Sequence, residues 1–303
     1  MVDVAMLTKQ GGRDHNEDYI RKATYEEQLC LILCDGLGGH ACGEIASELV
    51  AESIAKGFEK QGYYAGFFKD ALEQAQKELL EEQTKKNKIV LVMHLYFEDL
   101  LEESYRYVSS MPESADIYLT TDTEEKKAAI EKVFAKLPCN KLEVRVIKNR
   151  GRDVSSLLVG VKDVIMQYDI ACFAHDKKTA QVKPGTIGAS FAYKCFQNTL
   201  ANKMYVANVI NTFVNNPRLG ILSPPEPNHS TFFTTIGFEW GPNFDVTRKL
   251  AKDLGLHVPM NVMAPPVAPL GTMFWFRPKA LKPLFDKDWD YKDFPPEPNK
   301  IDG

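Results

Sequence analysis

The chain has 303 residues, of which 44% are hydrophobic and 26% are charged, a composition typical of folded globular domains and not of disordered or fibrous chains. Its formal net charge of −4 is too small to indicate a nucleic-acid-binding surface. No apolar run approaches the roughly 18–20 residues of a membrane span, and the first twenty residues lack the apolar core of a signal peptide. We therefore expect a cytoplasmic protein that binds no nucleic acid and whose contact with the inner face of the membrane is peripheral at most.

Charge is unevenly distributed along the chain. Residues 1–86 hold 10 Lys and Arg against 16 Asp and Glu, whereas residues 87–303 hold 27 against 25. The acidic first block suits a cation site, and the near-neutral second block with local basic clusters suits an anionic ligand. The length favours two domains, or one large domain with an appendage, and we place the boundary at the charged segment 84–88, which gives domains 1–86 and 87–303. The six scattered cysteines are expected to be structural thiols.

The first block is predicted to contain two strands and two helices. The strands cover residues 2–7 and 29–34, and the amphipathic helices cover residues 43–61 and 67–83. Two acidic turns lie among them, and the carboxylates of Glu17 and Asp35 could share a hard cation such as Mg²⁺ or Mn²⁺. The carbonyl of Gly36 would be accessible to that ion, and Arg13 could hold a phosphate beside it. A solvated turn is the better interpretation of either acidic motif alone.

The two motifs occur together, and their combination resembles the PPM family of metal-dependent serine/threonine phosphatases. The matching stretches are Gly12-Arg13, Asn16-Glu17-Asp18, residues 35–40 and residues 43–47. The resemblance implies that Asp35 bridges two metal ions, that Glu17 and the Gly36 carbonyl ligate one of them, and that Arg13 binds phosphate. It ends near residue 85, and the later acidic residues of the family have no counterpart. We therefore expect an incomplete α+β phosphatase-like segment that could hold Mg²⁺ or Mn²⁺ without phosphatase activity.

The second block alternates predicted strands with predicted helices. The strands cover residues 89–95, 116–120, 142–148 and 169–174, and the helices cover residues 98–110, 124–137 and 153–167. Repeated units of this length predict a parallel sheet with helices on both faces. Beyond them we expect a helix over residues 190–212, strands over 219–222 and 272–276, and a short helix over 279–285. In such a sheet the ligand lies beyond the carboxyl ends of the strands, in the loops 94–97, 120–123, 149–153 and 175–179.

Basic residues are concentrated in two of these loops. The segment Asn149–Asp153 ends one strand and precedes a predicted helix, where free N–H groups favour an anion. The segment 175–179 ends the next strand. A solvated basic loop and an ordinary helix cap explain each segment singly, but both segments at adjacent strand ends favour a diphosphate site. Its cationic residues would be Arg150, Arg152, His175, Lys177 and Lys178.

With their flanks these segments resemble the rhamnan synthesis F family of bacterial polysaccharide glycosyltransferases. The corresponding stretches are residues 93–96, 149–153, 174–178, 216–217, 220–221 and 271–278. The resemblance spans about residue 88 to the C-terminus. It implies transfer of a deoxyhexose, typically L-rhamnose, from a nucleoside diphosphate donor such as dTDP-rhamnose to a cell-surface glycan acceptor, which can be lipid-linked.

The predicted strand ends carry no DxD metal motif, so we expect transfer to need no cofactor and the basic residues to stabilise the leaving diphosphate. The candidate catalytic bases are Asp153 and Asp176, although Asp153 could instead cap a helix. The residues expected to line the sugar and acceptor site are His94, Tyr96, Trp240 and Asn243.

We therefore expect an α/β protein, a Rossmann-like (GT-A-like) parallel-sheet domain behind an incomplete phosphatase-like segment. A Mn²⁺- or Mg²⁺-dependent serine/threonine protein phosphatase, and a non-catalytic fusion of two incomplete domains, remain the alternatives to a glycosyltransferase.

Overall fold

The computed structural model describes residues 4–10, 16–36, 43–178, 185–225, 240, 243–264, 266–269 and 271–297. The chain divides into two compact units, residues 1–86 and 87–303. No helix among the described residues is long and apolar enough to cross a membrane.

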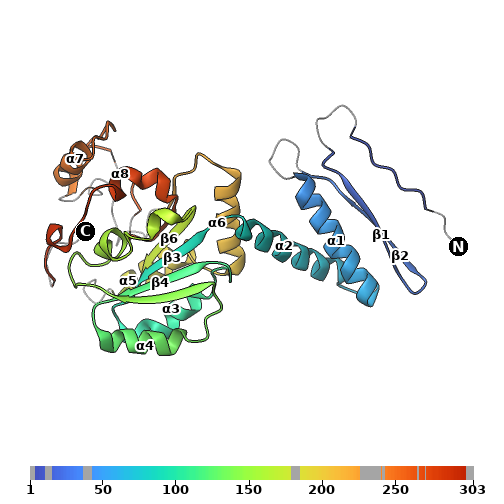
Figure 1. Cartoon of the computed structure of the whole chain (residues 1–303), viewed down its shortest axis with the longest axis horizontal. Helices are drawn as coiled ribbons and strands as arrows, with labels where there is room; N and C mark the ends of the chain where they lie inside the picture. The colour runs from blue at the N-terminus through green and yellow to red at the C-terminus, as the bar shows by residue number, and fades with distance from the viewer. Residues whose placement is uncertain are drawn as a thin grey trace. The chain divides into compact units, whose positions relative to one another are not determined.

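The first unit is a two-stranded antiparallel hairpin packed on helices (Figure 1). Strands β1 (Tyr19–Tyr25) and β2 (Gln28–Cys34) pair along their whole length, and helices α1 (Gly43–Gln61) and α2 (Phe67–Lys85) follow. Side chains alternate along β2 because successive residues of a strand face opposite ways. Cys30 and Ile32 join the core with Ala51, Ala55 and Phe58, whereas Leu31 and Leu33 are exposed.

Both helices of the first unit and the predicted strand over residues 29–34, which is β2, are confirmed, but the rest of the hairpin differs from the prediction. Residues 4–10 form no strand, and β1 was not predicted. The hairpin turns at Glu26 and Glu27, and Glu26 has a φ of 51°. Because such turns usually contain Asn or Gly, this sequence carries no recognisable hairpin signal.

The second unit contains a six-stranded sheet in the order β5-β4-β3-β6-β8-β7. Strands β3 (Ile89–His94), β4 (Asp116–Thr121), β5 (Lys141–Val146) and β6 (Ile170–His175) are parallel. Strand β8 (Phe274–Phe276) runs antiparallel to β6 and to β7 (Ile221–Leu222). All six residues of β3 are buried, as expected of a central parallel strand covered on both faces. The predicted α/β class is thereby confirmed, but the sheet is mostly and not wholly parallel, because β7 and β8 extend it with antiparallel pairs.

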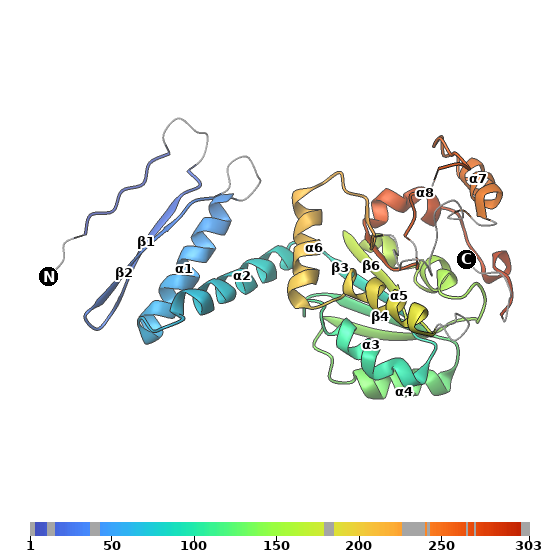
Figure 2. The same cartoon turned by 180° about the vertical axis from the view of Figure 1, so that it is seen from behind.

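Helices cover one face of this sheet. Helices α3 (Leu101–Val108), α4 (Glu124–Phe134), α5 (Gly185–Gln197) and α6 (Lys203–Asn215) share one hydrophobic cluster with Leu91 and Met93 of β3. The opposite face, with Val90 and Val92, packs against turns between residues 156 and 168 and against α8 (Lys282–Phe285). Figure 2 shows these layers from behind.

The predicted helix over residues 153–167 is wrong. The segment forms a π-helical turn at Ser156–Gly160 and a 3-10 turn at Ile165–Gln167. The carbonyl of Gly160 accepts a hydrogen bond from Arg145 (2.9 Å), and an added Cβ at Gly160 would lie 3.2 Å from Ile147. Glycine also weakens a helix, so tertiary contacts at this residue override the helical spacing.

The predicted helix over residues 190–212 is two helices, α5 and α6. The chain is not helical between the end of α5 and Asn202. The Asn202 side chain accepts a hydrogen bond from the Tyr205 amide (3.0 Å) and so forms the N-cap at which α6 begins. The buried Trp275 ring donates to the carbonyl of Thr199 within the interruption (2.9 Å). Helix α7 (Phe244–Asp253) was not predicted.

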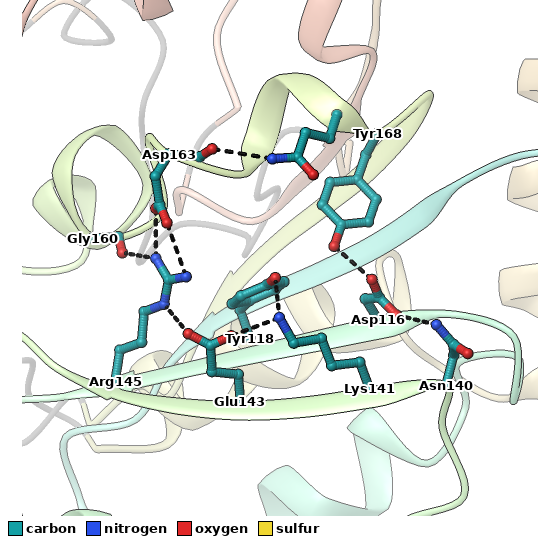
Figure 3. A network of polar contacts seen from close by, with 10 residues as sticks. Asp116, Tyr118, Asn140, Lys141, Glu143, Arg145, Gly160, Asp163 and Tyr168 are labelled. Atoms are coloured by element: carbon teal, nitrogen blue, oxygen red, sulfur yellow. Dashed lines mark hydrogen bonds and ion pairs between the residues drawn. The ribbon is translucent and has the colours of Figure 1, made fainter.

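A network of polar side chains joins edge strand β5 to the segment 156–168 (Figure 3). Arg145 donates to both carboxylate oxygens of Asp163 (2.6 and 3.1 Å) and to Glu143 (2.6 Å). The buried Tyr168 hydroxyl donates to Asp116 (2.6 Å). The network therefore supplies hydrogen bonds in place of a regular helix on this face.

Candidate functional site

The parallel topology brings the predicted loops to one edge of the sheet. The chain continues from β3 to β4 and β5 on one side, whereas β6 lies on the other side of β3. A ligand crevice is expected where the strand order reverses in this way. His94 and His175 end the two central strands and are register partners, so both imidazoles lie at this position.

His94 is held inside the protein by hydroxyl groups. Its Nδ1 lies 2.9 Å from Thr120 Oγ1, which lies 2.8 Å from Ser156 Oγ, and all three residues are buried. Burial lowers the pKa of His94 from 6.5 to about 4, although the charge of Asp153 acts in the opposite direction. His94 is therefore neutral at pH 7 and fixed in orientation.

Asp176 anchors the loop that follows β3. Its Oδ2 accepts hydrogen bonds from the amides of Tyr96 (2.8 Å) and Phe97 (2.6 Å), and its own amide donates to the carbonyl of His94. Burial raises the pKa of Asp176 to about 6, while the two amide donors oppose that rise. These contacts indicate a positioning role for this residue.

Asp153 and His175 form the second half of the site. The Oδ2 atom of Asp153 is buried without a hydrogen-bond partner and lies 3.8 Å from Nε2 of His175. The His175 ring lies between two carbonyl oxygens, with Nδ1 2.8 Å from that of Asp176 and Nε2 2.9 Å from that of Gly271. A buried carboxylate oxygen without a hydrogen bond is costly, so this oxygen has unused capacity to accept a hydrogen bond.

The two arginines of the predicted diphosphate site contact the C-terminal segment. Arg150 donates from Nε to the carbonyl of Tyr291 (2.8 Å) and from Nη2 to that of Phe294 (2.5 Å), and Arg152 pairs with Glu297 (3.9 Å). An added Cβ at Gly151 would lie 2.6 Å from Phe294. The basic loop is therefore packed under residues 291–297, and these hydrogen bonds use donors that the prediction assigned to diphosphate.

Lys177 and Lys178 border a cavity of about 290 Å³ between α3 and α5, near the lower end of the size range for small-molecule sites. Lys178 pairs with Asp99 (2.6 Å), and the Lys177 ammonium lies 4.2 Å from the centre of the Phe191 ring. Asp176 also lines this cavity, together with Ser104 and the aromatic rings of Tyr193 and Phe196.

Trp240 and Asn243, predicted to line the acceptor site, lie beside α7. The Trp240 indole donates to the carbonyls of Asn261 (3.2 Å) and Ala264 (2.7 Å) and packs edge-on against Phe244. Asn243 precedes the first residue of α7 without a side-chain cap. The structure thus brings His94, Tyr96 and Asp153 together with residues 175–178. It places Trp240 and Asn243 in a different segment, next to α7.

The model of the family described as rhamnan synthesis protein F matches residues 51–303. The chain belongs to the rhamnan synthesis protein F family. The match begins within α1 and so includes the end of the first unit as well as the whole second unit.

Two proteins named "Uncharacterized protein WxcX", from two strains of Xanthomonas campestris pv. campestris, are also similar to this rhamnan synthesis F family chain. Each is 26% identical over 215 residues, which are 70% of this chain and 29% of the relative. The chain thus spans under a third of the length of these relatives.

The phosphatase-like features of this family member do not assemble into a metal centre in the part that the structure describes. There, no group of three or more His, Cys, Asp or Glu side chains could hold a metal ion. Asp35 is exposed, and Gly36 lies so close to the backbones of Glu17 and Gly43 that an added Cβ would be 2.7 Å from both carbonyl oxygens. These close backbone contacts are enough to explain why position 36 is a glycine. Arg13 lies outside the described residues.

Sequence reasoning missed several site residues. Thr120, Ser156 and Lys126 were not singled out from the sequence. Thr120 and Ser156 orient His94. The Lys126 ammonium lies 3.6 Å from the centre of the Tyr96 ring and pairs with Asp122 (2.7 Å). Thr120 could have been found, because it ends a predicted strand. Ser156 could not, because the segment that carries it resembled an ordinary helix.

Proposed function

We propose that the chain is a glycosyltransferase that moves a sugar from a nucleoside diphosphate donor to a bacterial cell-surface polysaccharide. Membership of the rhamnan synthesis protein F family supports this proposal. The observation that carries it is the meeting of His94, Asp153 and His175 at the reversal point of the parallel sheet, where α/β folds bind such ligands.

Asp153 is the proposed catalytic base. Transfer requires a group that takes the proton from the attacking acceptor hydroxyl as the new glycosidic bond forms. The buried Oδ2 of Asp153 has no hydrogen-bond partner, although it lies 3.8 Å from Nε2 of His175, whereas Oδ2 of Asp176 is engaged by two backbone amides. We therefore assign the base to Asp153 and a supporting role to Asp176.

The charge that grows on the departing diphosphate needs cationic partners. The proposed partners are His175, which ends β6, and Lys177 and Lys178, which lie on the loop that follows. Arg150 and Arg152 could contribute only if the contacts with residues 291–297 were exchanged for the ligand. We propose that these side chains act without a metal ion and that the donor is dTDP-rhamnose.

The proposed acceptor is a growing glycan, bound beside His94 and Tyr96. We propose no separate activity for residues 1–86, because their likeness to metal-dependent phosphatases rests on four short stretches of sequence alone.

A thermal-shift screen tests this function. We expect dTDP-rhamnose and dTDP to raise the melting temperature of the second unit equally with Mn²⁺ and with EDTA. The Lys177→Ala variant should show a smaller shift, whereas Lys249→Ala, a matched change on α7, should retain it. A screen of nucleotide sugars without any shift would contradict the proposal.

A further inference from the structure

An uncharged segment follows α7, and several of its side chains lie on the surface before it enters the core at Met273 and strand β8. Residues 254–276 contain no Asp, Glu, Lys or Arg, yet several large apolar side chains of this segment are exposed. Val258 is 61% exposed, Met263 is 87% exposed and Val267 is fully exposed. When exposed apolar side chains form a contiguous patch, they mark a site of interaction with a protein or a membrane.

Cationic side chains adjoin this apolar surface. A groove of about 310 Å³ is lined by Arg248, Lys252 and His257 together with the apolar Leu256, Val258 and Met260, and none of its described lining residues is acidic. Arg248 also pairs with Asp245 (2.9 Å), both largely exposed. The groove therefore combines positive charge with apolar walls, a combination that matches an amphipathic anion.

Helix α7 contributes to the same surface. It has no buried residue, and Figures 1 and 2 both show it at the periphery of the second unit, outside the sheet and its covering helices. Its cations, Arg248, Lys249 and Lys252, outnumber its two acidic residues, Asp245 and Asp253, and lie shortly before the apolar segment. Basic residues beside exposed apolar side chains are typical of segments that lie in the interface of an anionic bilayer.

The apolar segment also leads into the candidate site. The carbonyl of Gly271 lies 2.9 Å from Nε2 of His175. A surface that engaged residues 254–264 and Val267 would therefore be connected to the site by a few residues of chain.

We propose that α7, residues 254–264 and Val267 form a docking surface for an anionic lipid bilayer. Val258, Val262, Met263 and Val267 would enter the interface, and Arg248 and Lys252 would contact lipid phosphates. The proposal depends on this surface and not on the proposed transfer reaction.

Sedimentation of the full chain with vesicles tests the proposal. Vesicles of 70% phosphatidylcholine and 30% phosphatidylglycerol should bind the chain, vesicles of pure phosphatidylcholine should bind it less, and 0.5 M NaCl should weaken binding, because salt screens the cations. A double variant with Val262→Ser and Met263→Ser should reduce the partition coefficient at least about fivefold, because two apolar side chains are removed from the interface. Arg248→Glu with Lys252→Glu should reduce binding to the anionic vesicles selectively.

The matched control is Leu31→Ser with Leu33→Ser, which removes two exposed apolar side chains from β2 (58% and 72% exposed). Vesicle binding should survive this change. Absence of binding, or binding lost in the β2 control and retained in the Val262/Met263 variant, would overturn the proposal. The chain could instead dimerise in a concentration-dependent way that the Val262/Met263 variant abolishes. That result would assign the surface to a second copy of the chain and would also overturn the membrane proposal. The thermal shift with dTDP-rhamnose should persist in the Val262/Met263 variant, so a failure of docking is distinguishable from a failure of the proposed function.

Discussion

At the scale of single residues, the two aspartates predicted as bases have different surroundings. Asp153→Asn removes the carboxylate whose Oδ2 has no hydrogen-bond partner. We expect it to lower the rate of sugar transfer by about 10²–10⁴-fold with little change in the KM for the donor. Steady-state release of the nucleoside diphosphate measures both quantities.

Asp176→Asn is the matched comparison, since an amide oxygen can still accept hydrogen bonds from Tyr96 and Phe97. It should keep the transfer rate within about tenfold. If Asp176→Asn abolished turnover while Asp153→Asn left it intact, the two assignments would have to be exchanged.

The buried His94 predicts a dependence of stability on pH. Its pKa is about 4 in the folded chain and 6.5 without burial, so between these values the unfolded chain binds a proton that the folded chain does not. The contribution of His94 to stability is complete above pH 6.5 and falls as the pH drops towards 4. Between pH 7.5 and 5 we expect a loss of about 2 kcal/mol.

Urea denaturation at both pH values measures this loss. The His94→Gln variant, which lacks the titrating group, should lose about 2 kcal/mol less than the wild type over the same pH interval. Equal losses in the two proteins would show that His94 is not buried in its neutral form.

Part of the site was predictable at this scale. His94, His175 and Asp176 end buried strands, and the alternation of strands and helices predicts that such ends share one edge. The contacts of Arg150 with Tyr291 and Phe294 were not predictable, because they join residues more than 140 positions apart. No local pattern carries such information.

At the scale of elements, the network around Arg145 stabilises a segment that could not complete a helix. Arg145→Ala should lower the free energy of unfolding by about 1–3 kcal/mol, because it leaves Glu143, Asp163 and the Gly160 carbonyl without their shared donor. Urea denaturation of the second unit measures the change. Arg248→Ala, which breaks an exposed ion pair with Asp245, is the control and should change stability by less than about 0.5 kcal/mol. If the two variants lowered the free energy of unfolding equally, the network around Arg145 would contribute no more to stability than an exposed ion pair.

Elements with strong periodicity were predicted well, as α1 and the four parallel strands illustrate. Two kinds of element were missed. Strand β1 lacks a recognisable turn, and the segment 156–167 has helical spacing that Gly160 and its contacts override. In both cases the deciding interactions are tertiary, whereas the signals used were local.

At the scale of the whole molecule, the two units have separate hydrophobic cores. One cluster contains Phe58 of α1, and another contains Phe213 of α6. We expect calorimetry to show two transitions. Phe58→Ala should lower only the transition of the first unit and Phe213→Ala only that of the second, each by about 3–5 kcal/mol in unfolding free energy. A single transition that both variants shift equally would contradict this division.

Hydrogen exchange with and without dTDP-rhamnose tests the central claim most directly, because it locates the donor on the unmodified chain. Binding at the carboxyl ends of the central strands should slow exchange in the peptides that contain residues 94–97, 149–153 and 175–178, and it should leave the hairpin of the first unit unchanged. Slower exchange confined to other segments, with none at these strand ends, would contradict the claim that this edge of the sheet binds the nucleotide sugar.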